Sequence, residues 1–123
     1  MNYPEKYLEG IKCFNERQYF ECHECLESLW LEVGGIQEIF YQALIQAAVA
    51  IYHLERGNFW GAQSLYQESL KKFSKVPDLY MGLQVREFEQ DFKKFFTPYL
   101  ALKKGDFIEI SPASFPKIIL VIG

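Results

Sequence analysis

The chain has 123 residues and a formal net charge of −3, and 50% of its residues are hydrophobic while 24% are charged. This length and balance are typical of one soluble globular domain and exclude a disordered chain. Residues 1–55 hold nine acids and three bases, residues 56–104 hold five acids and nine bases, and the last nineteen residues add −1. The weakly acidic total argues against a nucleic acid partner. The charge division instead predicts that the two halves attract each other, within one chain or between chains.

The sequence predicts a cytoplasmic protein with no membrane association and with reduced thiols. No apolar run reaches the length of a membrane span, and the first ten residues, MNYPEKYLEG, lack the basic start and apolar stretch of a secretion signal. The cysteines, Cys13, Cys22 and Cys25, are odd in number, and the last two lie three apart in an expected helix. A disulfide framework is therefore not expected.

Helical periodicity predicts five helices. The first covers about residues 4–16, with a proline in its first turn, and the second covers about residues 18–33, where two consecutive glycines end it. Residues 36–56 are apolar almost all round, as expected of a helix surrounded by others. The fourth helix covers about residues 59–75 after a tight Gly-Asn turn. A fifth is expected over residues 79–102, with a kink or interruption at its Thr-Pro pair.

The C-terminal residues 106–123 have a different character, with β-branched side chains, two prolines and no helical period. The segment KIILVI is too apolar to be left in water, so we expect it to lie on the bundle or on a neighbouring subunit. The predicted architecture is an all-α, single-domain bundle of helix-turn-helix pairs over residues 1–105 with an extended tail. Homodimerisation through this tail is a further expectation.

Polar chemistry concentrates in residues 19–30, YFECHECLESLW. On a helical wheel His23 falls within the inward arc and should be buried, and Glu27 follows one turn later at the margin of that arc. Glu24 falls on the shoulder of the helix. A hydrogen-bonded His-Glu pair is either a structural contact that only stabilises the fold or part of a binding site.

A second polar stripe is expected on the apolar helix 36–56, where Gln42, Gln46 and His53 lie at similar angles. Buried amides require hydrogen-bond partners. Gln46 and His53 are about 10 Å apart along a helix. A single centre would therefore combine the His23 and Glu27 side chains with groups at the height of either Gln46 or His53, but not both.

Metal binding is one interpretation of the pair formed by His23 and Glu27, because side chains at i and i+4 can share a divalent ion. The second histidine of the H-E-x-x-H motif is absent, and no second Glu-x-x-His motif is present, which argues against a dinuclear centre. The C-x-x-C pair lacks a partner pair, so its thiols are expected to pack between helices.

Three motifs within residues 10–75 resemble one family in combination. FNERQYFECHECLESLW contains His-Glu-x-x-Glu-x-x-Trp, FYQALIQAAVAIYHLERGNFWGA contains Leu-Ile-Gln-x-Ala, and its end contains Gly-Asn-x-x-Gly-Ala. The motif positions are His23, Glu24, Glu27 and Trp30, then Leu44, Ile45, Gln46 and Ala48, then Gly57, Asn58, Gly61 and Ala62. They resemble the bacterial and archaeal domain-of-unknown-function family 309. The resemblance implies a small helical bundle and transfers no activity, and Ala43 departs from it where glycine is expected.

The leading functional hypothesis is a polar pocket that binds a small ligand or a divalent metal ion. Its expected ligand-binding residues are His23, Glu24, Glu27, Trp30, Gln46 and His53, with His23 and Glu27 as the metal-binding pair. A tetratricopeptide-like module that binds a protein partner is the alternative, because the segment from Gly57 matches one such helix-turn-helix unit. The third interpretation is a hydrolase that uses Glu24 or Glu27 as its base. The sequence identifies no catalytic residue.

Overall fold

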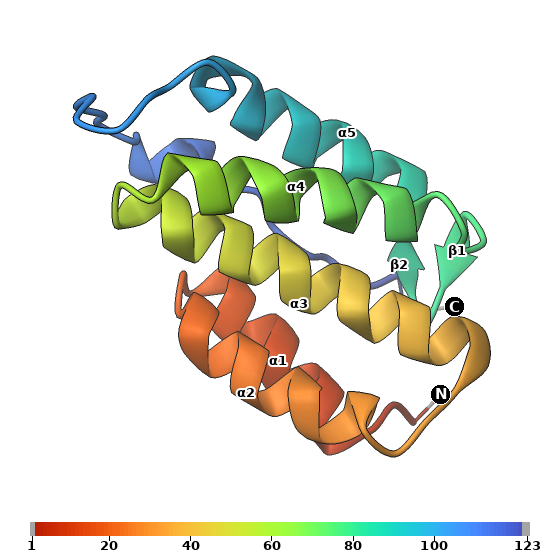
Figure 1. Ribbon diagram of the computed structural model, residues 1–123. Helices are drawn as coiled ribbons and strands as arrows, with labels where there is room; N and C mark the ends of the chain where they lie inside the picture. Colours follow the sequence, from red (N-terminus) through yellow and green to blue (C-terminus); the bar gives the residue numbers. More distant parts are fainter. Residues whose placement is uncertain (1, 122–123) are drawn as a thin grey trace.

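The computed structural model describes residues 2–121 and shows a helical bundle (Figure 1). Its elements are, in chain order, α1 (Glu5–Asn15), α2 (Tyr19–Trp30), α3 (Gly35–Glu55), α4 (Phe59–Phe73), β1 (Leu79–Tyr80), β2 (Leu83–Gln84), α5 (Val85–Phe96) and two short 3₁₀ turns, η1 (Thr97–Tyr99) and η2 (Pro112–Ser114). The helices α1 and α2 form one pair, and α3 and α4 form the next. The predicted all-α class is confirmed.

The central helix is α3, which lies between α2 and α4 (Figure 1). Ten of its 21 residues are buried. They are Phe40, Tyr41, Ala43, Leu44, Ile45, Ala47, Ala48, Ala50, Ile51 and Leu54. The small residues let α4 approach closely, and the Ser69 hydroxyl on α4 donates a hydrogen bond to the Ala43 carbonyl over 2.7 Å. No helix within residues 2–121 has the length and apolar character needed to cross a membrane.

The two helix pairs have the same kind of turn. Arg17 and Gly57 adopt left-handed backbone angles, with φ of 61° and 78°. The amide that follows each of them donates to a carbonyl in the last turn of the preceding helix, at 2.8 Å from Gln18 and 2.9 Å from Asn58. This is the hydrogen-bond pattern that ends helices at a left-handed residue. An aromatic residue then begins the second helix of each pair and is buried.

The fifth helix is shorter than the sequence predicts. Residues 79–84 form an antiparallel two-stranded hairpin instead of the first helical turns, and α5 begins only at Val85. The Asp78 carbonyl accepts from the Val85 amide at 2.6 Å, and its side chain accepts from the Arg86 amide at 3.2 Å, so this residue fixes where the helix starts. At the other end α5 gives way to η1, at the Thr-Pro pair where an interruption is expected.

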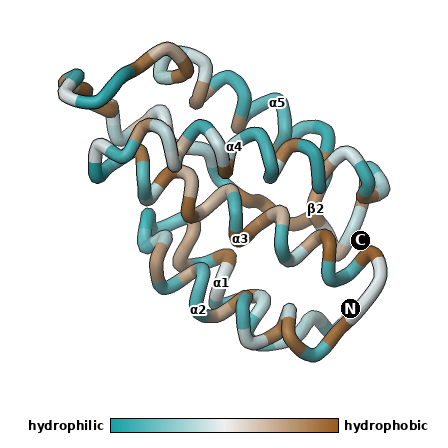
Figure 2. Tube along the Cα trace, viewed as in Figure 1, coloured by the Kyte–Doolittle hydropathy of each residue, from teal (hydrophilic) through white to brown (hydrophobic). Residues whose placement is uncertain are grey.

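The tail runs extended along its own bundle, behind α3 and towards β2, where Figure 2 colours it as strongly apolar. The Asn15 side chain at the end of α1 holds both backbone groups of Ile118. It donates to the carbonyl at 2.8 Å and accepts from the amide at 2.7 Å. The Val121 amide donates to the Gly82 carbonyl at 2.8 Å. Because Phe115 and Ile118 are both buried, the tail contributes to the core.

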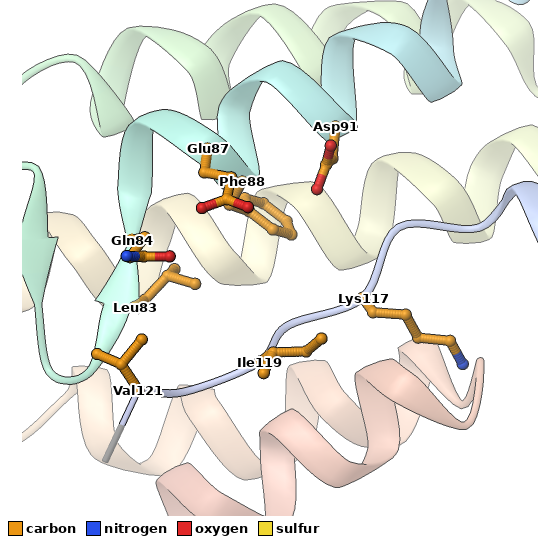
Figure 3. A pocket seen from close by; sticks show the side chains of 8 residues that line it. All are labelled: Leu83, Gln84, Glu87, Phe88, Asp91, Lys117, Ile119 and Val121. Atoms are coloured by element: carbon orange, nitrogen blue, oxygen red, sulfur yellow. The ribbon is translucent and has the colours of Figure 1, made fainter. Parts of the chain in front are cut away.

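A groove of about 160 Å³ separates this tail from α5 (Figure 3). Glu87 and Asp91 lie along its helical wall, and Lys117, Ile119 and Val121 lie along the tail. The Ile119 side chain is 77% exposed. Such an exposed apolar side chain on an extended segment is a potential contact for a second chain.

The close approach of α1 and α2 depends on Gly10. A Cβ atom at this position would lie 2.9 Å from Leu26 Cγ and Cδ2, and Leu26 is buried. We expect Gly10→Ala to lower the free energy of unfolding by about 1 kcal/mol in urea titrations, because overpacking outweighs the helical propensity that alanine gains. In a Leu26→Ala background the same change should be neutral or stabilising. An equal loss in both backgrounds would show that the cost does not arise from this contact.

Homodimerisation through the tail stays a prediction, and Ile119 gives its test. Removal of the whole tail would also remove the buried Phe115 and Ile118, so a point substitution is preferable. If a second copy covers this segment, Ile119→Asp should sediment as a monomer under conditions where the parent sediments as a dimer, because a buried unpaired carboxylate is costly. Leu31→Asp is the control, because Leu31 is a 72% exposed apolar residue outside the tail. A parent that is monomeric at the highest concentrations studied would refute the expectation.

Candidate functional site

The predicted His23–Glu27 pair is present on α2, but it is not buried. His23 Nε2 lies 2.9 Å from Glu27 Oε2, and the two side chains are 30% and 44% exposed. The expectation that His23 is enclosed is therefore wrong. The inward face of α2 is formed by Tyr19, Cys22 and Leu26, which turns the helix so that His23 lies at the edge of the contact with α3. The buried thiol of Cys22 acts as a small apolar side chain.

The Phe20 ring links His23 to Tyr52 on the surface between α2 and α3. The Phe20 ring lies 6.0 Å from the His23 ring and 6.0 Å from the Tyr52 ring of α3, measured between centroids. The guanidinium of Arg56 lies over the Tyr52 ring at 5.1 Å. Phe20 is exposed and Tyr52 is half-buried. The α2–α3 face, which we define as Phe20, His23, Glu27 and Tyr52, is thus partly open to solvent.

Gln46 shares the height of Glu27 but not its side of the contact. The contact between Phe20 and Tyr52 sets the register of the two antiparallel helices. Gln46 precedes Tyr52 by six residues, so it lies about 9 Å along α3 and about 120° around it from Tyr52. Gln46 Oε1 is buried and has no hydrogen-bond partner among the described residues. Because this atom is closed to solvent, it does not add to the surface that His23 and Glu27 present.

The remaining predicted residues lie at the ends of this face. Trp30 is half-buried one turn beyond Glu27, and Glu24 is exposed. His53 is placed by the turn between α3 and α4, where its Nδ1 atom lies 3.4 Å from Asn58 Nδ2. The structure therefore brings together His23 and Glu27, leaves Gln46 on another side of α3, and leaves His53 at the turn between α3 and α4.

Metal binding at His23 and Glu27 stays a prediction. Within residues 2–121, no group of three or more His, Cys, Asp or Glu side chains is placed to hold a metal ion. Structural zinc sites use four protein ligands and catalytic ones use three. An ion at this pair would thus need ligands in addition to these two side chains.

The three cysteines gather where α1 meets α2. Burial raises the pKa of the Cys22 thiol, and burial together with the nearby Cys25 and Glu21 raises the pKa of Cys13. The Cys25 thiol lies 3.9 Å from Glu9 Oε2. Raised pKa values keep thiols protonated and unreactive. This supports the interpretation of Cys13 and Cys22 as packing residues.

The sequence interpretation missed a polar cluster that joins α4 to α5. Arg86 Nη2 donates to the carbonyls of Phe73, at 2.7 Å, and Val76 at the end of α4. Its Nη1 atom lies 3.1 Å from Glu89 Oε1, although the two groups are not aligned as a hydrogen bond. In the sequence, Arg86 and Glu89 are a pair three residues apart, which is usually a surface pair on a helix. No local signal shows that Arg86 caps another helix.

Glu89 should make stability depend on pH, because it is only 8% exposed. Burial raises its pKa, and the charges of Arg86 and Lys93 only partly offset this. A folded-state pKa above the unfolded value contributes stability that is complete at low pH and is lost as pH rises through the folded value. We expect Glu89→Gln to gain stability relative to the parent between the ordinary glutamate value of 4.5 and neutral pH, as measured by urea titration.

The exposed Glu87 on the same helix gives the control for this experiment. Glu87→Gln should not reproduce the pH-dependent difference. A constant difference between Glu89→Gln and the parent across the pH range would show that burial of this carboxyl does not affect its protonation.

Comparison with known proteins supports the family resemblance of the sequence. Residues 7–65, which span α1 to the first half of α4, match the family model "Domain of unknown function (DUF309)". The "Uncharacterized protein YpuF" of Bacillus subtilis (strain 168) is 39% identical over 71 residues, which are 56% of this chain and 41% of that protein. The chain thus spans less than half the length of this relative. Over the helices that carry the three motifs, the resemblance to the domain of unknown function family 309 is confirmed.

Proposed function

We propose that the chain is a protein-binding module whose α2–α3 face binds an arginine side chain of a partner protein. The observation that carries this proposal is the half-exposed carboxylate of Glu27, which lies two helical turns from the exposed Phe20 ring on the same side of α2. Among the motif residues of α2, His23, Glu24 and Glu27 are at least partly exposed, so they are available to a partner.

The chemistry of the face suits a guanidinium group. The Glu27 carboxylate is an acceptor, and a guanidinium offers five N–H donors in a planar fork. The exposed Phe20 ring adds a surface on which a guanidinium stacks favourably. Arg56 lies over the Tyr52 ring in the same way within the chain. Residues 1–55 also carry a formal charge of −6, from nine acids and three bases, which attracts a basic partner.

A protein side chain fits this face better than the other interpretations do. The half-exposed pair of His23 and Glu27 suits a partner that approaches from solvent. The two grooves described here are lined by other residues, and the hydrolase interpretation gains no support from them. The tetratricopeptide-like alternative also predicts protein binding, and the exposed Phe20 with the half-exposed Glu27 favours the α2–α3 face as its location.

An NMR titration with N-acetyl-arginine amide tests the proposal. The ligand should shift the amide signals of residues 20–30 and 46–53 in a saturable way. Glu27→Gln should weaken binding by about fivefold, since it removes one charge partner. The matched control is Glu68→Gln, because Glu68 is 47% exposed and also pairs with a cation on its own helix. Shifts spread over all acidic residues, or an equal effect of both variants, would refute the proposal.

A further inference from the structure

A second concave surface lies where the start of α4 meets the segment that follows α5. Its volume is about 470 Å³. It is lined by Gly57, Asn58, Phe59, Trp60, Gln63, Leu102, Lys103 and Lys104. None of these residues belongs to the α2–α3 face. The volume is within the range of about 300–1,000 Å³ that small-molecule sites occupy.

Hydrogen bonds hold both walls of this α4 groove in place. On one wall, the Asn58 side chain caps α4 by accepting from the Gly61 amide at 3.1 Å. Gln63 Nε2 then donates to the carbonyls of Tyr99, at 3.2 Å, and Leu102, at 3.3 Å, and so fastens the second wall to α4. The groove is therefore formed by the folded chain before any ligand arrives.

Trp60 presents its ring to solvent at the side of this groove. Its side chain is 81% exposed, whereas the preceding Phe59 is buried. An indole ring with its faces uncovered is a stacking surface for a planar ring, and aromatic stacking of bases on such residues is a common means of binding. Nothing else among the described residues pairs with the Trp60 ring in an aromatic contact.

Two cations complete the lining. Lys103 and Lys104 are exposed, and neither forms an ion pair within residues 2–121. Asp106 is the nearest acid in the same turn, and its carboxylate accepts from the Lys103 amide at 2.8 Å. This bond, with the left-handed Gly105, fixes the backbone of the turn while the two ammonium groups stay free to bind an anion.

We propose that the α4 groove binds a nucleoside phosphate, with its base stacked on Trp60 and its phosphates bound by Lys103 and Lys104. A planar ring and a multiply charged anion in one small molecule match the two uncovered chemistries of this groove. The groove volume suits one such molecule. This site is independent of the proposed arginine-binding face, because the two share no residue.

The test follows the indole N–H signals by NMR, since the chain contains only two tryptophans. The full chain is titrated with ADP, and separately with adenosine and with inorganic phosphate. ADP should shift the Trp60 indole signal and leave that of Trp30 unchanged, and it should bind more tightly than either fragment. Trp60→Phe assigns the signal, and its high exposure makes this variant safe for folding.

Paired lysine variants complete the experiment. Lys103→Ala with Lys104→Ala should raise the Kd for ADP by about fivefold or more. Lys93→Ala with Lys94→Ala is the matched control, because it removes an adjacent and exposed lysine pair from α5. The control should leave the Kd unchanged. An unshifted Trp60 signal, binding of phosphate as tight as that of ADP, or an equal effect of both lysine pairs would overturn the proposal.

Discussion

The burial of α3 by its neighbours is the constraint on which the other features of the structure depend. Almost all of its large side chains face another helix, and the small Ala43 and Ala47 let these helices approach closely. Only a stripe that includes Gln42 and Gln46 stays half-buried, and Tyr52 lies at its margin beside α2. Because an apolar helix cannot leave polar groups in its core without partners, this stripe is where polar chemistry concentrates. The candidate face therefore follows from incomplete coverage of α3.

The sequence predicts the helices and the His23–Glu27 pair well, because both depend on spacing along one helix. It does not predict how far the His23 side chain is buried. A helical wheel assigns one inward direction, whereas α2 packs against both α1 and α3 and buries Cys22 between them. The rotation of α2 is thus set by tertiary contacts. A pattern of apolar residues along α2 alone does not contain that information.

Long-range backbone contacts explain the other differences. The pairing of Asn15 with Ile118 joins residues 103 positions apart, and the Arg86 contact to Phe73 joins two helices through a carbonyl. Neither contact requires a particular neighbour in the sequence, so neither leaves a local pattern. The hairpin at residues 79–84 also leaves no recognisable sequence pattern, because its two strands have only two residues each. Its turn shows only after the left-handed angles of Met81 and Gly82 are known.

The tail and the turn before α2 stabilise each other. Arg17 adopts a left-handed angle that glycine adopts at the equivalent Gly57, which costs about 1 kcal/mol or more for a residue with a side chain. Its guanidinium lies over the ring of Phe115, at 5.2 Å, and this ring stacks on Tyr19 at the start of α2. A contact between the tail and the turn thus offsets the backbone cost and fixes the first residue of α2. The position of His23, one turn later, depends on the same contact.

Among the described residues, the acidic and basic side chains of the two halves of the sequence do not pair with each other, so their charges can attract external partners. Attraction between the two halves predicts ion pairs between them, yet every ion pair within residues 2–121 joins side chains three or four positions apart on one helix. The reason is that the halves meet through the apolar faces of α3 and α4, which place charged side chains outside the contact. Acidic groups around Glu27 and basic groups at Lys103 and Lys104 therefore face solvent, where they attract ligands of opposite charge. An acidic face and a basic groove on one small bundle suit two ligands of opposite charge.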